Sequence, residues 1–288
     1  MTIPFSTKDS VNGWLTDSGL GSIADLTAVS GGCIAENFCL TTTKGEQLFL
    51  KTVNGSPPAI FQAEADGLDA MRLATNMQIP KVFAVDNDWL LLEYIHPGQP
   101  APDFWLRLAE GLAQMHRHIA PQFGFPQNNF CGTTPQINPW CADGYSFFGQ
   151  QRLRYQGELA RQQGLLGEGD VNRLEQIIER LPDWIPEQPA SLIHGDLWSG
   201  NIHCNQQGQP VLVDPACHYG WREADIAMTQ LFGALPQPFY EHYHRCFPMS
   251  EGWQQRLPLY NLYHLLNHLN LFGTAYLTSV QAIIARCG

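Results

Sequence analysis

Residues 192–201 read LIHGDLWSGN, and residues 211–214 read VLVD, a short apolar strand that ends in an acidic residue. In phosphoryl transfer, one carboxylate must lie near the attacking hydroxyl, while an Asn and a second carboxylate hold Mg²⁺ against the phosphates. We therefore predict that Asp196 is the catalytic base and that Asn201 and Asp214 are the metal ligands. The same residue types are common in ordinary turns. The Asp at the strand end favours phosphoryl transfer over a simple turn.

Two further parts of a kinase occur upstream in the expected order. Gly31, Gly32 and Cys33 lie between two apolar stretches, where main-chain N–H groups could cover the phosphates. This signal is weak by itself, because a Gly-Gly pair is usually just a hairpin. Residues 47–51 then form a predicted strand that ends in Lys51, the candidate that neutralises the α- and β-phosphates.

A carboxylate on the next predicted helix can pair with this lysine. Apolar residues recur at spacings of three and four from Ile60 to Met71, and Glu64 lies on the same stripe. A carboxylate on a face that packs into the core is costly unless it is paired. Lys51 is the natural partner, although Glu64 at the edge of the stripe could instead reach water. We favour the Lys51–Glu64 ion pair of a kinase.

Two more strands, at 79–85 and 89–95, are separated by a turn and followed by a Pro- and Gly-containing break at 96–100. We predict that this break is the hinge and that the main chain of Glu93, Tyr94 and Ile95 binds adenine. The predicted fold class is α+β, a two-lobed protein-kinase-like fold. Residues 1–95 would form a small lobe with an antiparallel sheet and one helix, and residues 96–288 the hinge and a larger, mostly helical lobe.

The second half of the chain has helical periodicity. Helices are predicted at 104–119, 145–154, 171–181 and 260–269, whereas 121–140 is irregular, rich in aromatics and typical of a functional segment. His116 is expected to be a satisfied core histidine. His264 and His268 could share a helix face, but no Glu accompanies them as in a zinc-protease motif. A packed helix is the better interpretation. Asp225 is expected to accept hydrogen bonds from the main chain of the catalytic segment.

Composition indicates a soluble enzyme. The chain has 288 residues, 44% of them hydrophobic, and a net charge of −11. Such a negative charge disfavours nucleic-acid and anionic-membrane surfaces. The sequence has no recognisable signal peptide or membrane-spanning run, and its eight cysteines are scattered. We therefore expect a cytoplasmic protein with reduced thiols, with neither a nucleic acid nor a membrane as partner.

The complete set of motifs resembles the fructosamine-3-kinase, or ketosamine-3-kinase, family, a branch of the aminoglycoside-phosphotransferase-like kinases. The resemblance covers nearly the whole chain, and the Trp-containing catalytic segment together with the two late segments is its most specific part. It rests on residues 30–34 (SGGCI), 61–68 (FQAEADGL), 131–140 (CGTTPQINPW), 194–201 (HGDLWSGN), 214–216 (DPA), 220–228 (GWREADIAM) and 262–273 (LYHLLNHLNLFG).

The resemblance implies ATP- and Mg²⁺-dependent phosphorylation of the 3-hydroxyl of a ketosamine, free or protein-bound, as a step in protein deglycation. Asp214 is followed by Pro215-Ala216 rather than Phe-Gly, so activation-loop control of the protein-kinase type is not supported. A cationic sugar–amine adduct needs carboxylates, hydrogen-bond acceptors and an aromatic face. The candidates for these contacts in the large lobe are Trp198, Gln136, Asn138, Trp140, Trp221 and Glu223.

Three other functions remain open at this point. A kinase of the aminoglycoside or choline type would share everything except the acceptor. A non-catalytic nucleotide-binding module is disfavoured by the joint presence of Lys51, Asp196, Asn201 and Asp214. A redox-regulated interaction protein is the third, because oxidation of Cys33 could block nucleotide entry or link two chains. The chain is accordingly expected to be a monomer or a redox-linked dimer.

Overall fold

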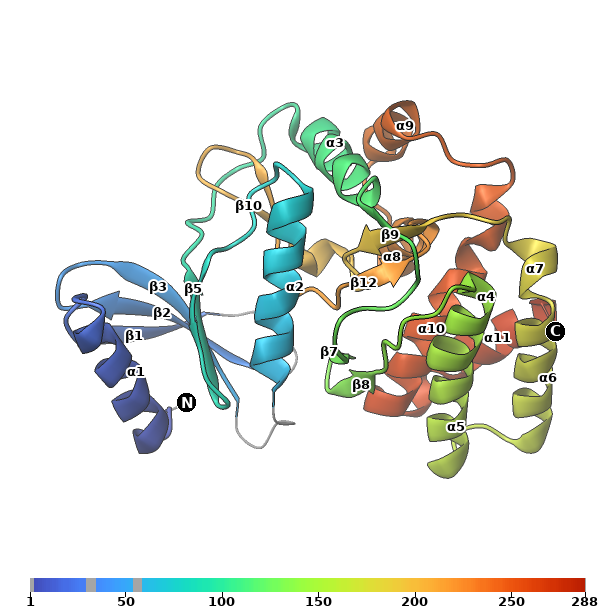
Figure 1. Cartoon of the computed structure of the whole chain (residues 1–288), viewed down its shortest axis with the longest axis horizontal. Helices are drawn as coiled ribbons and strands as arrows, with labels where there is room; N and C mark the ends of the chain where they lie inside the picture. Colours follow the sequence, from blue (N-terminus) through green and yellow to red (C-terminus); the bar gives the residue numbers. More distant parts are fainter. Residues whose placement is uncertain (1–2, 30–34, 54–58, 288) are drawn as a thin grey trace.

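The computed structural model describes residues 3–29, 35–53 and 59–287, which form a β-rich lobe and a larger helical lobe side by side (Figure 1). The predicted glycine turn, with Gly31, Gly32 and Cys33, lies outside the described residues. The α+β, two-lobed class predicted from the sequence is confirmed.

The small lobe is built on a five-stranded antiparallel sheet in the order β1-β2-β3-β5-β4. β3 is central, and its Lys51 is paired with Asn37 on one neighbouring strand and with Leu90 on the other. Lys51 therefore lies on a central strand and is buried, rather than solvated at an edge of the sheet. The strands are β1 (Ile23–Val29), β2 (Glu36–Thr42), β3 (Gln47–Thr52), β4 (Val82–Val85) and β5 (Trp89–Glu93).

Two helices cover this sheet, one on each face, whereas the sequence predicted one helix in this lobe. Side chains alternate across β5, so that Leu91 packs with α1 (Phe5–Asp17), while Leu90 and Leu92 belong to the core that includes α2 (Ile60–Ala74). Figure 1 shows α2 between the sheet and the large lobe and α1 on the outer side. The additional helix, α1, closes the far face of the sheet.

The large lobe holds the remaining elements around one continuous apolar core. Its helices are α3 (Phe104–His116), α4 (Gly144–Phe148), a π-helical turn (Gly149–Arg154), α5 (Tyr155–Gln162), α6 (Glu168–Glu179), α7 (Leu181–Trp184), α8 (Glu223–Leu231), α9 (Gln237–Cys246), α10 (Trp253–Phe272) and α11 (Leu277–Cys287), with short 3₁₀ turns at Ser199–Asn201 and Thr274–Tyr276. Its strands are β6 (Ile119–Ala120), β7 (Asn129–Cys131), β8 (Thr134–Gln136), β9 (Ala190–Ile193), β10 (Ile202–Cys204), β11 (Pro210–Leu212) and β12 (His218–Gly220).

Three short β-structures in this lobe position the chemistry. The segment predicted to be catalytic runs from β9, in the sheet β12-β9-β6, to the hairpin β10-β11. Asp214 lies in the link from β11 to β12. The stretch predicted to be irregular, 121–140, contains the hairpin β7-β8, and β7 lies against α2. The hairpin β7-β8 and the link after β11 therefore approach α2 from the large lobe.

The lobes are joined by the chain after β5 and by polar contacts around Gln78. Its amide donates to the Glu93 carboxylate (3.1 Å) and its amide oxygen accepts from Asn205 (2.6 Å). The Gly98 main-chain N–H donates to the Cys204 carbonyl (3.0 Å). We propose that the lobe boundary falls near residue 95, within this connection. None of the helices in the described ranges combines the length and the apolarity needed to cross a bilayer.

We predict that α1 is a structural part of the small lobe. Leu15 is fully buried against the sheet, so Leu15→Ala should lower the free energy of unfolding by about 2–5 kcal/mol. Leu73→Ala is the matched control: the same change on α2, where the side chain is 85% exposed, should have an effect within about 0.5 kcal/mol. Urea unfolding followed by circular dichroism measures both. Equal midpoints for the two variants would contradict this role.

Candidate active site

The structure brings Lys51 and Glu64 together, as the helical periodicity predicted. Lys51 Nζ lies 2.8 Å from both carboxylate oxygens of Glu64 and also donates to Asp214 Oδ1. The three groups come from β3, α2 and the link after β11. One ammonium thus connects both lobes at a single buried point.

Charge and burial compete in this cluster. Burial alone would lower the pKa of Lys51, but the neighbouring Asp214 and Glu64 carboxylates outweigh it and raise that pKa above its ordinary value. Burial raises the pKa of Glu64, and the Lys51 ammonium opposes that rise. Burial would also raise the pKa of Asp214, but the Lys51 ammonium lowers it overall. Lys51 is therefore held as a cation beside an ionised Asp214.

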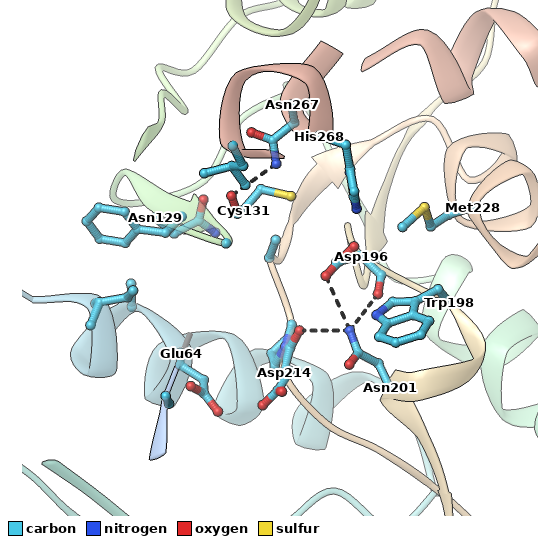
Figure 2. Close-up of a pocket in the computed structure, with 18 of the residues that line it drawn as sticks. Glu64, Asn129, Cys131, Asp196, Trp198, Asn201, Asp214, Met228, Asn267 and His268 are labelled. Carbon is cyan, nitrogen blue, oxygen red and sulfur yellow. Dashed lines mark hydrogen bonds between the residues drawn. The ribbon is translucent and has the colours of Figure 1, made fainter. Parts of the chain in front are cut away.

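Asp196 and Asn201 face each other across the turn that follows β9 (Figure 2). Asn201 Nδ2 donates to the Asp196 carbonyl (2.8 Å) and to Asp196 Oδ2 (3.3 Å). Burial, together with the negative charge of Asp214, raises the pKa of Asp196 to about 7. The amide nitrogen of Asn201 is occupied by Asp196, which leaves its Oδ1 as the oxygen available to a ligand.

Two features give the turn its shape. Gly195 has φ +81°, and a Cβ there would lie 2.1 Å from the Ala216 carbonyl oxygen, so only glycine fits. Asp225, at the start of α8, accepts from the main-chain N–H of Gly195 (2.9 Å) and of His194 (2.7 Å), and His116 Nε2 lies 3.1 Å from the same carboxylate. The predicted structural roles of Asp225 and His116 are confirmed.

The Asp214 segment is held close to α2. Asp214 has φ 54°, a left-handed conformation that Asp tolerates better than most residues. Gly67 of α2 faces Pro215, and a Cβ on this glycine would lie 3.0 Å from Pro215 Cγ. The absence of a side chain at Gly67 permits the approach that brings Glu64 and Asp214 to the same ammonium.

A cavity of about 530 Å³ opens between the lobes over these groups. Figure 2 shows Asp196, Asn201 and Asp214 on one side, with Cys131 and His268 across from them. The polar side chains that line the cavity are Asn37, Lys51, Glu64, Asn129, Cys131, Asp196, Asn201, Asp214, Asn267 and His268. Acidic, cationic and amide groups thus converge on one hollow, as in a site for a charged, hydroxyl-bearing ligand.

The outer wall of the cavity is aromatic. Phe232 packs against His268 (ring centroids 4.8 Å apart) and, edge-on, against Trp198 (6.3 Å). His268 also contacts Phe272 (5.4 Å) and Tyr276 (5.1 Å). Phe232 is 38% exposed and Phe272 is 50% exposed, which is unusual for large apolar side chains beside a cavity. These five residues form what we call the aromatic wall.

Of the aromatic wall, only Trp198 was predicted from the sequence. Its ring lies over Gly200, where a Cβ would be 2.3 Å from the ring atoms. The four missed residues lie on α10, in the turn after it or just past the end of α8. His268 and Phe272 are four residues apart on α10, a spacing that places them on one face. That spacing was visible in the sequence, but it does not distinguish a cavity wall from an ordinary packed face.

The structure does not bring the other predicted acceptor residues into the cavity lining. Gln136 and Asn138 are buried one layer behind it, where both donate to Asn129 Oδ1 (2.7 and 2.8 Å). Asn129 itself lines the cavity. Gln136 and Asn138 therefore position a cavity residue, and direct substrate contact by these two is not the geometry observed.

The structure places Trp140, Trp221 and Glu223 outside the cavity lining and therefore does not support the predicted substrate contact for them. Glu223 is fully buried and forms an ion pair with Arg256 (2.6 Å), so its carboxylate is neutralised inside the large lobe. Trp221 is buried among other rings of the core, and Trp140 lies on the surface against Tyr219. Trp221 and Glu223 follow the segment 192–201 in sequence and Trp140 ends the aromatic-rich stretch 121–140, but none of the three lines the cavity.

Of the predicted adenine-binding residues, Glu93 ends β5 and Tyr94 and Ile95 follow it, and none of the three is in the cavity lining. The main-chain N–H of Glu93 donates to the Lys81 carbonyl (2.8 Å), so this donor is already occupied. The Glu93 carboxylate accepts from the Gln78 amide, which also contacts the large lobe. Glu93 thus supports the lobe connection, and Tyr94 and Ile95 follow it at the start of the hinge.

The chain is similar to proteins of one family over nearly its whole length. The sequence profile described as "Fructosamine kinase" matches residues 10–287. A "probable ketoamine kinase" of Synechocystis is 40% identical over 273 residues, which cover 92% of this chain and 90% of the relative. The chloroplastic protein-ribulosamine 3-kinase of Arabidopsis thaliana is 36% identical over 289 residues, covering 96% and 87%.

Solved structures agree with this relationship. A candidate fructosamine-3-kinase from Thermobifida fusca superimposes with a TM-score of 0.88 at 31% identity, covering 97% of this chain and 98% of that structure. A gentamicin-bound aminoglycoside phosphotransferase has a TM-score of 0.70 at 12% identity, covering 100% and 98%. The second likeness concerns the fold alone.

Proposed function

Because the chain belongs to the fructosamine kinase family, we propose that it is an ATP-dependent kinase that phosphorylates the 3-hydroxyl of a ketosamine. The acceptor is a ribulosamine or fructosamine, free or attached to a protein, and the reaction serves deglycation. The observation that carries the proposal is one cavity in which Asp196, Asn201 and Asp214 face the Lys51–Glu64 pair beneath the aromatic wall.

The donor set beside Asp196 fits Mg²⁺. Asn201 and Asp214 both offer oxygen, the ligand type that this hard cation prefers. The Asn201 amide nitrogen is held by Asp196, and the Asp214 side chain is 39% exposed toward the cavity. We propose that these two residues hold the ion, which supplies neutralisation of the phosphate charge when bound.

We assign the remaining nucleotide contacts from where the residues lie in the structure and in the sequence. Lys51, kept cationic by its carboxylate partners, would pair with the phosphates, and Glu64 fixes its side chain. The turn containing Gly31, Gly32 and Cys33 is proposed to cover the phosphates. Tyr94 and Ile95 are proposed to bind adenine through their main chain, because the N–H of Glu93 is occupied.

Asp196 is proposed to orient the acceptor hydroxyl and to accept its proton. Its carboxylate lines the cavity between the Asn201 amide and the aromatic wall, at the junction of the two reactants. A loose transition state requires little covalent chemistry from the protein, so catalysis comes from positioning and charge. The aromatic wall offers ring faces to a sugar and to a protonated amine.

A turnover panel tests the proposed function. We expect ATP-dependent phosphorylation of a ribulosamine or a fructosamine, with no transfer to kanamycin or choline. The isolated product, mapped by phosphorus–proton NMR, should carry its phosphate on the 3-hydroxyl. Robust phosphorylation of choline together with none of any ketosamine would overturn the assignment of the acceptor and leave only a kinase fold.

Removal of the proposed base should separate chemistry from binding. Asp196→Asn should lower kcat by about 10²–10⁴-fold, because proton acceptance is lost, while Mg-ATP affinity stays nearly unchanged. Asp183→Asn, the same change at an exposed position of α7, is the matched control and should leave both unchanged. Steady-state kinetics and nucleotide titration measure these effects. Near-normal turnover in the Asp196 variant would exclude it as the base.

The role of Asp214 has a signature in its dependence on Mg²⁺. Asp214→Asn should weaken nucleotide binding much more in the presence of Mg²⁺ than in EDTA, because the lost group is a metal ligand. Isothermal titration with ATP under both conditions measures the difference. Equal weakening in the two conditions would show that Asp214 is only structural.

A further inference from the structure

Cys131, Asp196 and His264 lie close together, and two of them, Cys131 and Asp196, line the cavity. Their sulfur, carboxylate oxygen and ring nitrogen all lie within 4.8 Å of one another. The residues come from the β7-β8 hairpin, the catalytic segment and α10, so the fold assembles the group from three separate places. Figure 2 shows the Cys131 sulfur directed toward the space beside Asp196.

The buried His264 ring has a nitrogen that makes no hydrogen bond within the part of the chain that the structure describes. Its side chain is only 3% exposed, and among the described residues its Nδ1 has no hydrogen-bond partner. Asp196 Oδ1, at 4.0 Å, is too distant for a hydrogen bond. Burial lowers the pKa of His264 to about 3, so the ring is neutral. A buried ring nitrogen without a partner is costly unless something occupies the space in front of it.

The Cys131 sulfur is held in place by its main chain. Asn267 Nδ2 donates to the Cys131 carbonyl (3.1 Å), and Gly132, with φ +64°, makes the tight turn that follows. Cys131 is buried, but it lines the cavity, and Asp196 lines the same cavity. An ion arriving through the cavity therefore reaches both groups.

Thiolate, imidazole and carboxylate are the three ligand types of zinc sites. With metal–ligand bonds of about 2.0–2.3 Å, tetrahedral ligand atoms lie about 3–4 Å apart, so side-chain shifts of roughly 1 Å suffice here. Because Cys131 and Asp196 line the cavity, a fourth ligand can approach the ion from that side. Mg²⁺ prefers oxygen ligands and would not select a site with sulfur and nitrogen. This group is therefore chemically distinct from the proposed Mg²⁺ ligands, Asn201 and Asp214.

We propose that Cys131, Asp196 and His264 form a binding site for Zn²⁺ and that the bound ion switches the enzyme off by occupying Asp196. Coordination breaks the S–H bond of Cys131 and forms a sulfur–zinc bond, and the proton leaves to solvent without any redox change. The inhibition rests on the proposed function, because it assumes that Asp196 contacts the acceptor. The binding itself does not.

Cobalt titration tests the site without any substrate. With Mg-ADP present in excess to fill the nucleotide site, Co²⁺ should bind one equivalent and give a thiolate-to-cobalt charge-transfer band and visible tetrahedral bands. Cys131→Ser should abolish the charge-transfer band, and His264→Asn should weaken Co²⁺ affinity by about tenfold or more, since one of three protein ligands is lost. Cys141→Ser, which alters a cysteine outside the cavity lining, is the matched control and should bind like the wild type.

Inhibition supplies the second readout. Zn²⁺ should inhibit competitively with the ketosamine and not with Mg-ATP, and a chelator should restore activity. His264→Asn should raise the inhibition constant by the same factor as its loss of cobalt affinity, which keeps the test valid if Cys131→Ser does not fold. A wild-type protein without a thiolate band, or a band that persists in Cys131→Ser, overturns the proposal. Cobalt binding without ketosamine turnover would support the metal site and overturn only the proposed function.

Discussion

The buried contact of one ammonium with two carboxylates, Lys51 with Glu64 and Asp214, is the interaction on which the active site depends. It joins β3, α2 and the β11–β12 link, and Lys51 and Asp214 are 163 residues apart in the chain. Removing one partner of such a buried set generally costs about 3–5 kcal/mol, because the other charges remain unpaired. The Lys51 ammonium balances the ionised Asp214, and burial raises the pKa of both Glu64 and Asp196 to about 7, so the site becomes net negative as the pH rises through that value. We propose that a bare polyphosphate binds poorly here and that the nucleotide enters as its complex with a divalent cation.

The catalytic turn is supported differently, by hydrogen bonds to a buried acid. Asp225 accepts from two successive main-chain N–H groups. His116 of α3 contacts the Asp225 carboxylate, and the Tyr243 hydroxyl of α9 contacts the other ring nitrogen of His116. The helical lobe thereby fixes the direction of the Asp196 side chain. The ion pairs of Lys51 connect the two lobes, whereas hydrogen bonds to Asp225 shape the turn. Asn201 links these two parts, because its side-chain amide donates to the carbonyl oxygens of both Asp196 and Asp214.

The local sequence predicted those parts of the site that depend on short-range spacing. Glu64 lies on a helical stripe, and Asp196 and Asn201 lie five residues apart in one turn, so their placement needed no tertiary information. Glu223 was predicted to contact the substrate, but the structure pairs it with Arg256, which is 33 residues away, and nothing in the local pattern reveals that ion pair. The exposure of Phe232 and Phe272 likewise depends on how α8 and α10 end at the cavity. The helix α1 was missed because little more than Val11 and Leu15 forms its buried face.

The link between Asp214 and β12 is very short, since β12 begins at His218. The Ala216 N–H donates to the His194 carbonyl (2.8 Å), and the Ala216 carbonyl oxygen lies where a Cβ on Gly195 would be, so the link is packed directly on the catalytic turn. A segment of this length has no room to swing out into a second arrangement. Enzymes with a long, mobile segment at this point can be controlled by shifting a conformational equilibrium. We therefore expect the activity of this chain to be controlled by what occupies the cavity, whether nucleotide, acceptor or the proposed competing ion, rather than by movement of this link.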